Sequence, residues 1–416
     1  MTSKEANQRN PADRVALAVG DRFVVTVEKV AHGGHFIVRH QGAVIFVRHG
    51  IPGEEVEIEI TGTGSSFNRA DVISVISASP DRVSAPCQFA HRAGCGGCDF
   101  QHISLPRQRQ LKSEVITEQF SRIAKQDINV EVEEVGAALG YRTRFNAVTT
   151  RNGDLGFKQA RSNKVIPVSD CRILSPEMKY QELSAKRWKG DLRVEVSLST
   201  TGERTIATGY SRDDTPVRTS EGPDVGKYEV NGFALEVSQR SFWQSHKLAP
   251  TVLTKAILEY AKLQPGDKVL DLYGGVGLFT SQFLESVGDG GSVDLVEGSK
   301  SATADAIRNF ANFSNVSVHT GDVAKLLPRF SKADVIVLDP PREGAGKDVV
   351  TAMVALKPRS IVYIACDPAA LARDTTYLGE AGYKLQKLRA FDLFPMTHHI
   401  ESVALFTQLR YLDVKI

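Results

Sequence analysis

The strongest constraint on the fold is the alternation of apolar strands with helical patterns from about residue 245 onward. The strand candidates are KVLDLY, SVDLVE, VSVHT, ADVIVLD, SIVYIA, LQKLRAFDL and SVALFTQL. Strands that alternate with helices are typical of a doubly wound α/β domain. We therefore expect such a domain over residues 236–416, with ligands bound outside the carboxyl ends of its strands.

A glycine-rich turn follows the first of these strands, in VLDLYGGVGLFTSQFL. Gly274, Gly275 and Gly277 let the backbone turn sharply and approach a ligand closely. Glu297 ends the next strand, about 20 residues on, where an acid can bind ribose hydroxyls. The turn lacks the G-x-G-x-x-G spacing expected for a pyrophosphate, and the chain has no G-x-x-x-x-G-K-[ST] loop. A cofactor without phosphates, S-adenosylmethionine, suits this turn better than a dinucleotide.

Two further carboxylates follow later strands. Asp322, in TGD after the third strand, is placed to face an adenine or to cap the next helix. Asp339 begins DPPRE after the fourth strand, at the edge where such sheets bind ligands. The two prolines stiffen this loop and expose its carbonyl groups.

The stretch IVYIACDPAALARD places a single thiol, Cys366, at the end of the next strand. A lone cysteine is most often a buried structural residue, but this position favours a nucleophile. Because the thiolate is the reactive form, we expect the site and the following helix to lower the pKa of Cys366. Glu401, in FPMTHHIESVALF, is a candidate general base, and His398 and His399 are alternatives that the sequence does not separate.

The N-terminal part of the chain has a different pattern. Residues 13–76 contain short alternating strands between glycine turns, which predicts a small β-barrel of the kind that often binds oligonucleotides. Residues 77–235 begin with a linker and continue as a central β-rich domain. Within it, residues 104–124 have helical periodicity and form a segment able to pack on the C-terminal domain.

The segment CQFAHRAGCGGCDFQH contains three cysteines in 12 residues, and a fourth follows in SDC. These are Cys87, Cys95, Cys98 and Cys171. A C-x2-C pair is a strong ligand signal, and four thiolates suit either zinc or an iron–sulfur cluster. His91 or His102 would be able to replace one thiol in a zinc site.

Composition indicates the compartment and, weakly, the partner. The polar N-terminus has no export signal, no run of 18 apolar residues exists, and five cysteines suggest free thiols or metal ligands. We therefore expect a cytoplasmic protein without a membrane span, and a monomer by default. Residues 101–190 carry 16 Lys plus Arg against 10 Asp plus Glu, which weakly indicates a polyanion partner.

The order of DLYGGVG, LDPPREG, ACDPAALARD and HHIESVALF closely resembles the RNA uracil-5-methyltransferases, which form 5-methyluridine in transfer or ribosomal RNA. The resemblance implies a Rossmann-like S-adenosylmethionine methyltransferase domain, an N-terminal TRAM domain and a central domain. It also implies that the four cysteines of the central domain hold a [4Fe-4S] cluster rather than zinc, with a structural or RNA-positioning role.

The resemblance also assigns roles to residues. Cys366 would add to carbon 6 of uracil, carbon 5 would then take the methyl group, and Glu401 would remove its proton. Gln244 of SFWQSH, Tyr273 and Glu297 would contact the cofactor, and Asp339 would lie beside the cofactor and the base. The target nucleotide would have to leave its stack. The barrel and the cysteine set favour ribosomal over transfer RNA.

Other functions remain open at this stage. An N-methyltransferase would not need Cys366, and a cytosine-5-methyltransferase tends to carry a second cysteine near its Asp-Pro-Pro loop, which LDPPREG lacks. A non-catalytic RNA-binding protein with a zinc site is the alternative from another class, and the intact set of Cys366, Glu401 and Asp339 argues against it.

Overall fold

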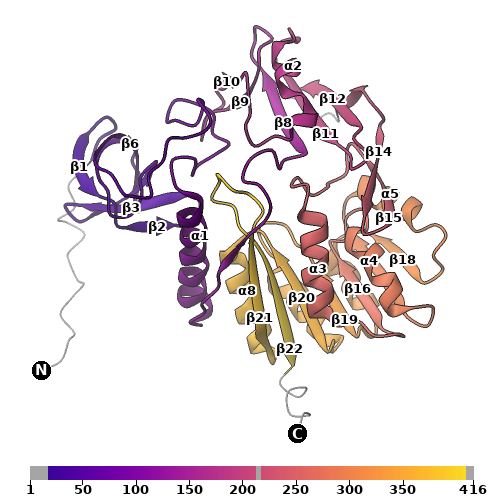
Figure 1. Ribbon diagram of the computed structural model, residues 1–416. Coiled ribbons are helices and arrows are strands. Elements are labelled where there is room, and N and C mark those ends of the chain that lie inside the picture. The colour runs from indigo at the N-terminus through magenta and orange to yellow at the C-terminus, as the bar shows by residue number, and fades with distance from the viewer. Residues whose placement is uncertain (1–16, 212–216, 409–416) are drawn as a thin grey trace, which may run out of the picture.

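The chain forms an N-terminal barrel, a central β-rich domain and a larger α/β domain (Figure 1). The computed structural model describes residues 17–211 and 217–408. The predicted limits at residues 13 and 416, and most of the N-terminal segment searched for an export signal, lie outside these ranges. Within them, no helix has the length and apolar character that a membrane crossing requires.

The barrel is a curled six-stranded sheet in the order β1-β5-β6-β4-β3-β2. Its strands are β1 (Arg22–Thr26), β2 (Lys29–Ala31), β3 (His35–His40), β4 (Ala43–Arg48), β5 (Glu55–Gly62) and β6 (Asn68–Ser77). In β3 and β4 alternate residues are buried, so Phe36, Val38, Ile45 and Val47 fill the interior while their neighbours face outward. The segment RFVVTVEKV forms two strands, because β1 pairs with β5 and β2 pairs with β3.

The central domain has its own antiparallel sheet in the order β10-β9-β8-β11-β12-β13. Its elements are β8 (Arg144–Thr149), β9 (Leu155–Lys158), β10 (Val165–Pro167), η3 (Pro176–Met178), α2 (Tyr180–Ala185), β11 (Leu192–Leu198), β12 (Arg204–Tyr210) and β13 (Arg218–Glu221). Phe145, Val194 and Leu183 belong to its core, and Cys95 and Cys171 pack against that core. The cysteine-bearing segment is therefore attached to this domain.

The C-terminal domain is built on an eight-stranded sheet in the order β18-β17-β16-β19-β20-β22-β21-β7. Its strands are β7 (Val132–Glu134), β16 (Lys268–Leu272), β17 (Ser292–Glu297), β18 (Val316–Thr320), β19 (Val335–Leu338), β20 (Ser360–Ala365), β21 (Tyr383–Asp392) and β22 (Glu401–Gln408). Strands β16 to β20 pair in parallel, and β22 runs antiparallel to β20. This is the doubly wound α/β fold that the alternation predicted.

Helices cover both faces of this sheet. They are α1 (Leu105–Gln119), α3 (Ala249–Ala261), α4 (Leu278–Val287), α5 (Lys300–Asn309), α6 (Val323–Leu326) with η4 (Leu327–Arg329), α7 (Gly346–Ala355) and α8 (Pro368–Glu380). Val362 and Ile364 of β20 share a core with α3, α4 and α5, whereas Ile361 and Tyr363 share a core with α1, α7 and α8. A strand buried on both faces explains the continuous apolar run SIVYIA.

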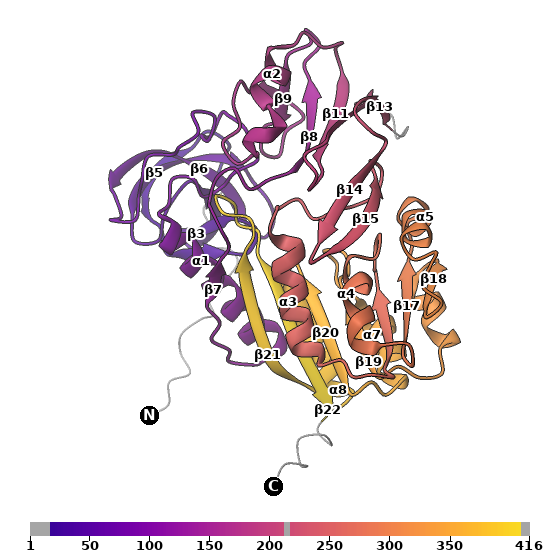
Figure 2. The ribbon, with the colours of Figure 1, turned by 45° about the vertical axis from the view of Figure 1, so that its right-hand side comes forward.

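Several pieces of the segment 77–235 join the C-terminal domain. Strand β7 pairs in parallel with β21, with Val132 opposite Ala390, and extends the sheet (Figure 2). Helix α1, which continues as a π-helical turn over Phe120–Ala124, packs on α8. The hairpin of β14 (Val225–Val230) and β15 (Phe233–Ser238) packs on α5. These contacts tie the central region to the sheet that carries the site.

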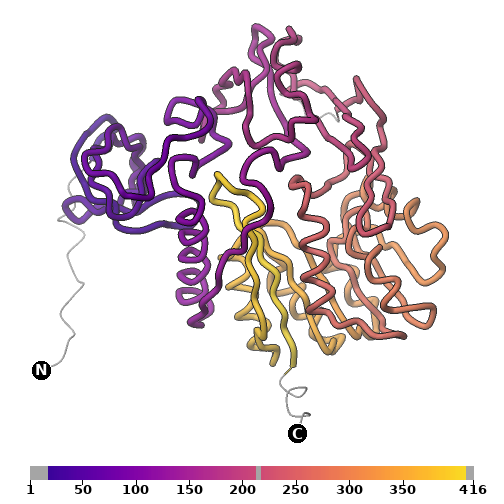
Figure 3. The backbone as a smooth tube through the Cα atoms, viewed as in Figure 1, coloured from indigo at the N-terminus to yellow at the C-terminus, as the bar shows by residue number. Residues whose placement is uncertain are grey.

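The loop between β21 and β22, yellow in Figure 3, rises beside α1. The Gln108 side chain of α1 accepts a hydrogen bond from the Met396 amide at 2.8 Å. The Met396 carbonyl in turn accepts from the Phe100 amide, just after the cysteine segment, at 3.0 Å. Phe100 also packs against Phe36 of the barrel, with ring centroids 5.9 Å apart. This loop is therefore the junction of all three domains.

A buried ion pair fastens α1 to the sheet. The Lys112 ammonium lies 2.6 Å from a carboxylate oxygen of Asp392 and donates to the Phe394 carbonyl at 3.0 Å, with both side chains at most 3% exposed. We expect Lys112→Met to destabilise the protein by about 3–5 kcal/mol, because Asp392 would remain buried without a counter-charge. Denaturant unfolding measures this, with exposed Lys347→Met as the control. A wild-type midpoint for Lys112→Met would contradict it.

Candidate active site

Five parallel strands deliver the predicted residues to one edge of the sheet. Tyr273, Glu297, Asp322, Asp339 and Cys366 end or directly follow β16, β17, β18, β19 and β20, respectively. The strands are in register, with Leu272 opposite both Val296 and Leu338, and Leu338 opposite Tyr363. The carboxyl ends therefore meet along one crevice, as the position of these residues in the sequence predicted.

The glycine-rich turn is held open at the start of this crevice. Tyr273, Gly275 and Gly277 have φ values of 60°, 57° and 93°, and a side chain at Gly277 would meet the Phe310 ring at 2.1 Å. The Gly275 amide donates to a Glu297 carboxylate oxygen at 3.1 Å, while a Cβ at Gly275 would meet nothing within 4 Å. The turn thus presents backbone and Glu297 to open space, as a ligand-binding turn requires.

Two aspartates, Asp271 and Asp322, accept hydrogen bonds from the helices that follow these strands. Buried Asp271 accepts from the Thr280 amide at 3.0 Å and its hydroxyl at 2.6 Å, and burial raises the pKa of Asp271 to about 7. Asp322 caps α6 by accepting from the Lys325 amide at 3.1 Å. Burial, with the charges of Asp322 and Asp374, raises the pKa of Tyr273 to about 12.

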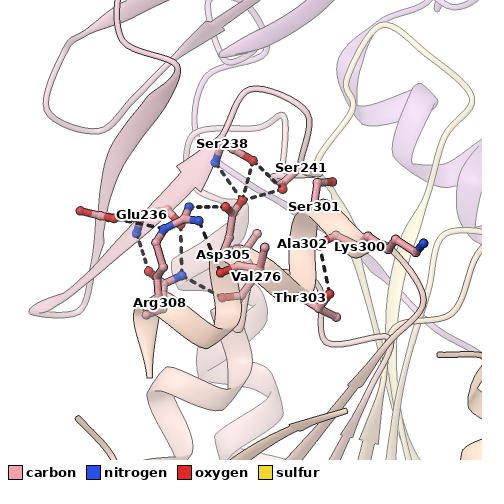
Figure 4. Close-up of polar contacts among 12 residues, drawn as sticks. Glu236, Ser238, Ser241, Val276, Lys300, Ser301, Ala302, Thr303, Asp305 and Arg308 are labelled. Atoms are coloured by element: carbon pink, nitrogen blue, oxygen red, sulfur yellow. Dashed lines mark hydrogen bonds and ion pairs between the residues drawn. The ribbon is translucent and has the colours of Figure 1, made fainter. Parts of the chain in front are cut away.

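Gln244, which was also expected to contact the cofactor, does not follow one of the strands that carry Tyr273 and Glu297. It is buried in the segment between β15 and α3, and none of the hydrogen bonds found there joins it to Tyr273 or Glu297. Figure 4 shows how this segment is anchored: Asp305 of α5 accepts from the Ser238 amide and from the hydroxyls of Ser238 and Ser241 at 2.9, 2.8 and 2.5 Å. Ser241, the last residue held by Asp305, lies three residues before Gln244, so these hydrogen bonds hold the chain that leads to Gln244.

The thiol and the glutamate meet across two neighbouring strands. Strand β20 pairs antiparallel with β22, and Ala365 lies opposite Ser402. Cys366 follows Ala365 and Glu401 precedes Ser402, so both residues lie at the same end of this strand pair, at the crevice edge. The charges of Glu401 and Asp339 both act on the pKa of Cys366, which places Asp339 near the same point.

The expectation of a lowered thiol pKa is wrong for the protein without ligands. Burial, together with the charges of Glu401 and Asp339, raises the pKa of Cys366 to about 12, although Arg342 opposes this. The N-terminus of α8 does not offset the effect, because the Asp367 side chain accepts from the Ala369 and Ala370 amides at 3.0 and 2.9 Å. The thiol is therefore neutral at rest, and deprotonation must come with the substrate or the cofactor.

Two carboxyl groups at this edge lack counter-charges in direct contact. Burial and the charge of Asp339 raise the pKa of Glu401, while burial and Asp271 raise that of Asp339. Among the described residues neither side chain has a hydrogen-bond or ion-pair partner, and Arg342 acts on Glu401 only through its charge. Such groups are costly unless a cation joins them, so the donor set fits a positively charged ligand such as a sulfonium.

A cavity of about 140 Å³ opens onto Cys366. Its walls include the β2–β3 turn of the barrel, Phe100, helix α1, and the loops that carry Arg342, His398 and His399. His32 of the barrel turn bonds Asp367 at 2.9 Å, and His398 bonds Asp99 at 2.6 Å. The cavity is thus closed by contacts between domains that no local sequence pattern predicts.

Three cavity residues were missed by sequence reasoning. Arg342 stands inside DPPRE, so its position after Asp339 was a usable signal. His32 and Lys112 belong to a turn and a helix whose contact with the C-terminal domain appears only in the folded chain. Both histidines proposed as bases line the cavity; burial and the charge of His398 lower the pKa of His399 to about 3, whereas His398 is hydrogen-bonded to Asp99.

The four cysteines of the central region are brought together, but not onto one point. All four are free and half-buried, and burial raises the pKa of Cys98 and of Cys171 to about 12, with further contributions from neighbouring cysteines. Among the described residues, no three His, Cys, Asp or Glu side chains are arranged to hold a metal ion. His102 instead bonds the Gly50 carbonyl of the barrel at 3.2 Å.

The raised thiol pKa makes a direct prediction. We expect alkylation of Cys366 by iodoacetamide, in protein without cofactor, to accelerate about tenfold per unit between pH 7 and pH 10, because only the thiolate reacts. Arg342→Gln should slow it, since the Arg342 charge lowers this pKa. Peptide mass spectrometry separates Cys366 from the other four thiols. A rate that levels off below pH 8 would instead support a lowered pKa.

Family models match three parts of the chain. The model for tRNA (uracil-5-)-methyltransferase matches residues 323–409, which include Asp339, Cys366 and Glu401. The TRAM domain model matches residues 17–73, the barrel. The model for protein-L-isoaspartate(D-aspartate) O-methyltransferase matches residues 230–354, which contain the glycine-rich turn. The glycine-rich turn and the segment with Asp339, Cys366 and Glu401 therefore each lie within a match to a methyltransferase model.

Relatives match nearly the whole chain. An uncharacterized RNA methyltransferase of Streptomyces avermitilis is 39% identical, covering 93% of this chain and 98% of the relative. The 23S rRNA (uracil(1939)-C(5))-methyltransferase RlmD of Shewanella amazonensis is 31% identical, covering 94% and 97%.

Among solved structures, the Pyrococcus abyssi tRNA (uracil-54, C5)-methyltransferase in complex with S-adenosyl-L-homocysteine has the same fold. Its TM-score is 0.70 at 21% identity, covering 92% of this chain and 99% of that one. The fold, the placement of the thiol and the carboxyl groups, and the full-length relatives lead to one assignment. This chain belongs to the RNA uracil-5-methyltransferase family, whose members use S-adenosylmethionine to methylate RNA.

Proposed function

We propose that the protein forms 5-methyluridine in 23S ribosomal RNA, with Cys366 as nucleophile and Glu401 as the base that takes the carbon-5 proton. The observation that supports this proposal is the pairing of β20 with β22, whose last pair, Ala365 and Ser402, directly adjoins Cys366 and Glu401. Asp339 acts electrostatically on both groups and completes the set.

The residues act in sequence on one uracil ring. Cys366 reacts as the thiolate: its sulfur bonds to carbon 6, and the electron pair of the carbon 5–carbon 6 double bond shifts toward the carbon 4 carbonyl, which makes carbon 5 electron-rich. Bound S-adenosylmethionine supplies an electrophilic methyl group at that carbon. Glu401 then takes the proton from carbon 5, the electron pair of that C–H bond restores the ring double bond, and the sulfur–carbon 6 bond breaks to release Cys366.

The cofactor would be held along the open crevice. Glu297 would bind its ribose hydroxyls, Tyr273 and Asp322 would flank its adenine, and Asp339 would face its positive charge. Gln244 would close the site from the segment that Asp305 anchors. The open space above Gly275 and the unpaired carboxyl groups support this arrangement. A cation near Asp339 and Glu401 would also lower their pKa values, keeping Glu401 ready as a base.

Ribosomal RNA is favoured over transfer RNA as the substrate. The relative named for uracil 1939 of 23S rRNA is 31% identical over almost the full length, whereas the structure named for tRNA is 21% identical. Transfer RNA is the second candidate, because the same fold carries that activity. A cytoplasmic location agrees with either RNA.

A 5-fluorouracil-containing RNA tests the proposal. Fluorine at carbon 5 is not removed as a proton, so the Cys366 adduct should persist through denaturation. We would incubate wild-type protein and S-adenosylmethionine with matched 23S rRNA and tRNA transcripts, then map the linked peptide and nucleotide by mass spectrometry. A link between Cys366 and 23S rRNA is expected. A link only to tRNA would move the substrate assignment, and no link to either would overturn the uracil-5 mechanism.

We further propose that Cys87, Cys95, Cys98 and Cys171 bind a [4Fe-4S] cluster. Four free, half-buried thiols suit tetrahedral sulfur coordination, and the resemblance of the cysteine set to the family's iron–sulfur site favours the cluster over zinc. The Gly97 amide already donates to the Cys95 sulfur at 3.4 Å, and the amides of Ile173 and Leu174 donate to Cys171.

Anaerobic purification decides between the two metals. A brown protein with about four irons per chain would support the cluster, and a colourless protein containing zinc would overturn it. We expect Cys171→Ser to lose the metal and Cys366→Ser to retain it, since Cys366 lies in the other domain.

A further inference from the structure

The motif ACDPAALARD ends in two charged residues, Arg373 and Asp374, that take no part in the proposed steps on uracil. Asp374 lies on α8 and is fully buried. Its Oδ2 atom accepts hydrogen bonds from the Ala345 and Gly346 amides at 2.7 and 3.2 Å, and from the Tyr363 hydroxyl at 2.7 Å. Its Oδ1 atom accepts from Nε and Nη2 of Arg373 at 3.0 and 2.9 Å. Asp374 therefore fastens α8 to the end of the loop between β19 and α7.

The backbone of this loop, residues 339–345, lies directly against the Arg373–Asp374 pair. Gly344 has a φ of 78°, and a Cβ at this position would lie 2.6 Å both from Nη2 of Arg373 and from Oδ2 of Asp374. Nη2 of Arg373 also donates to the Glu343 carbonyl at 2.5 Å. The last three residues of the loop are thus held by side chains of α8, and only a glycine allows the approach.

Arg342 is the residue of this loop that reaches the nucleophile. It lines the cavity that opens onto Cys366, and its charge opposes the rise in the Cys366 pKa that burial causes. The Arg342 side chain is exposed, and in the described part of the chain it has no ion-pair partner and one hydrogen bond, to Nδ1 of His399 at 3.4 Å. Its position therefore depends on the backbone of the loop that carries it.

We propose that Asp374 is a positioning residue for the reaction: it holds the end of the loop so that Arg342 stays beside the Cys366 cavity. The inference rests on the proposed function, in which Cys366 reacts as the thiolate and a nearby positive charge favours that form. Because Asp374 is fully buried, it acts through the loop and not on the substrate. The carboxylate is suited to this task, since it accepts at both oxygens and every group around it is a donor.

Asp374→Asn tests the proposal, because an asparagine does not satisfy the donors present. Its amide group would face either the loop amides or the Arg373 guanidinium, so two donors would meet in both cases. In protein without cofactor, we expect alkylation of Cys366 by iodoacetamide at pH 8 to slow about 3- to 10-fold. Loss of the Asp374 charge alone would favour the thiolate and speed the reaction. A slower reaction therefore reports the displacement of Arg342.

A double variant shows whether Asp374 acts through Arg342. If it does, Arg342→Gln combined with Asp374→Asn should react no more slowly than Arg342→Gln alone, because the charge that the loop positions is already gone. The same measurement on Tyr363→Phe removes one hydrogen bond to Asp374 without changing any charge, and it should also slow alkylation. Peptide mass spectrometry measures the rate at Cys366 in each variant.

Asp305→Asn is the matched control. Asp305 is 1% exposed, and it too accepts three hydrogen bonds at one carboxylate oxygen and one from an arginine, Arg308, at the other (Figure 4). Its replacement should lower the unfolding midpoint about as much as Asp374→Asn does, because both variants leave buried donors unpaired. It should leave the alkylation rate of Cys366 in cofactor-free protein at the wild-type value, since its hydrogen bonds hold a different segment.

Three results would overturn the positioning role of Asp374. They are a wild-type alkylation rate in folded Asp374→Asn, an equal slowing in Asp305→Asn, and a slowing by Asp374→Asn that persists undiminished in the Arg342→Gln background. If Asp374→Asn does not fold, Tyr363→Phe decides instead, and a wild-type rate in that variant overturns the role.

The 5-fluorouracil adduct at Cys366 separates this test from the proposed function, because alkylation needs no RNA. An adduct in wild type, together with unchanged alkylation in the Asp374 and Tyr363 variants, sinks the positioning role alone. Slowed alkylation in these variants, with no adduct in wild type, sinks the uracil mechanism and leaves the effect of Asp374 on the thiol standing.

Discussion

Replacing Cys366 with alanine is expected to lower methyl transfer to RNA by at least about 10⁴-fold, which corresponds to about 5 kcal/mol of transition-state stabilisation. Carbon 5 of uracil is a poor nucleophile, and the variant has no other thiol at the crevice, since the remaining four lie in the central region. Transfer of a labelled methyl group from S-adenosylmethionine to RNA measures the loss. The 5-fluorouracil adduct should vanish in the same variant.

The control for this prediction is retained binding. Cys366→Ala removes a half-buried thiol from the wall of an existing cavity, so S-adenosylmethionine affinity and the unfolding midpoint should stay near wild type. Cys171→Ala is the matched cysteine variant: it should leave the Cys366 adduct chemistry possible in any protein that still binds RNA. Methyl transfer by Cys366→Ala at a tenth of the wild-type rate or more would show that the thiol is not the nucleophile.

The residues that gather at this edge of the sheet could be predicted from the order of strands in the sequence. Each parallel strand ends on the same side, so residues directly after a strand, such as Tyr273, Asp339 and Cys366, had to gather at one crevice. Glu401 could be placed there only as a candidate, because its strand runs antiparallel and the relevant residue is the first one rather than the last. Its pairing partner became known only from the folded register.

The walls of the site could not be predicted, because they depend on contacts between distant segments. His32 reaches Asp367 across 335 residues, and Lys112 reaches Asp392 across 280. Neither residue lies in a pattern that differs from an ordinary turn or helix. The same cause explains the wrong expectation for the thiol pKa: the sequence shows a helix after Cys366, but not that Asp367 occupies the helix amides, or that the sulfur is buried within reach of the charges of Glu401 and Asp339.

The Asp367–His32 contact shows what this arrangement does for the site. Burial alone would raise the pKa of Asp367, but hydrogen bonds from His32 and the Ala370 amide lower it below its usual value. A negative charge is thereby fixed one residue from Cys366 and held by a histidine of the barrel. The barrel is thus part of the catalytic wall, and a change in its docking would be felt at Cys366.

Replacing Glu401 with glutamine should trap the reaction after methyl transfer. The glutamine keeps the shape of the side chain but does not accept the carbon-5 proton, so Cys366 cannot leave. We expect turnover to fall about 10²- to 10⁴-fold, the usual contribution of a positioned base. A denaturation-resistant complex of protein and ordinary uridine RNA should accumulate, carrying one methyl group per adduct. Gel shift after denaturation and mass spectrometry of the linked nucleotide measure both effects.

Two comparison variants make this result specific to the base. Asp339→Asn should lose turnover without accumulating a methylated adduct, because it acts before proton removal, beside the cofactor. His399→Gln, at the other candidate base, should turn over without a trapped complex, since its pKa of about 3 makes it a weak proton acceptor. A methylated adduct that accumulates in His399→Gln and not in Glu401→Gln would transfer the role of base to His399. The raised pKa of Glu401 adds a second signature: with the carboxylate as the active form, release of the methylated RNA from the adduct should speed up with pH in wild type and lose that dependence in the glutamine variant.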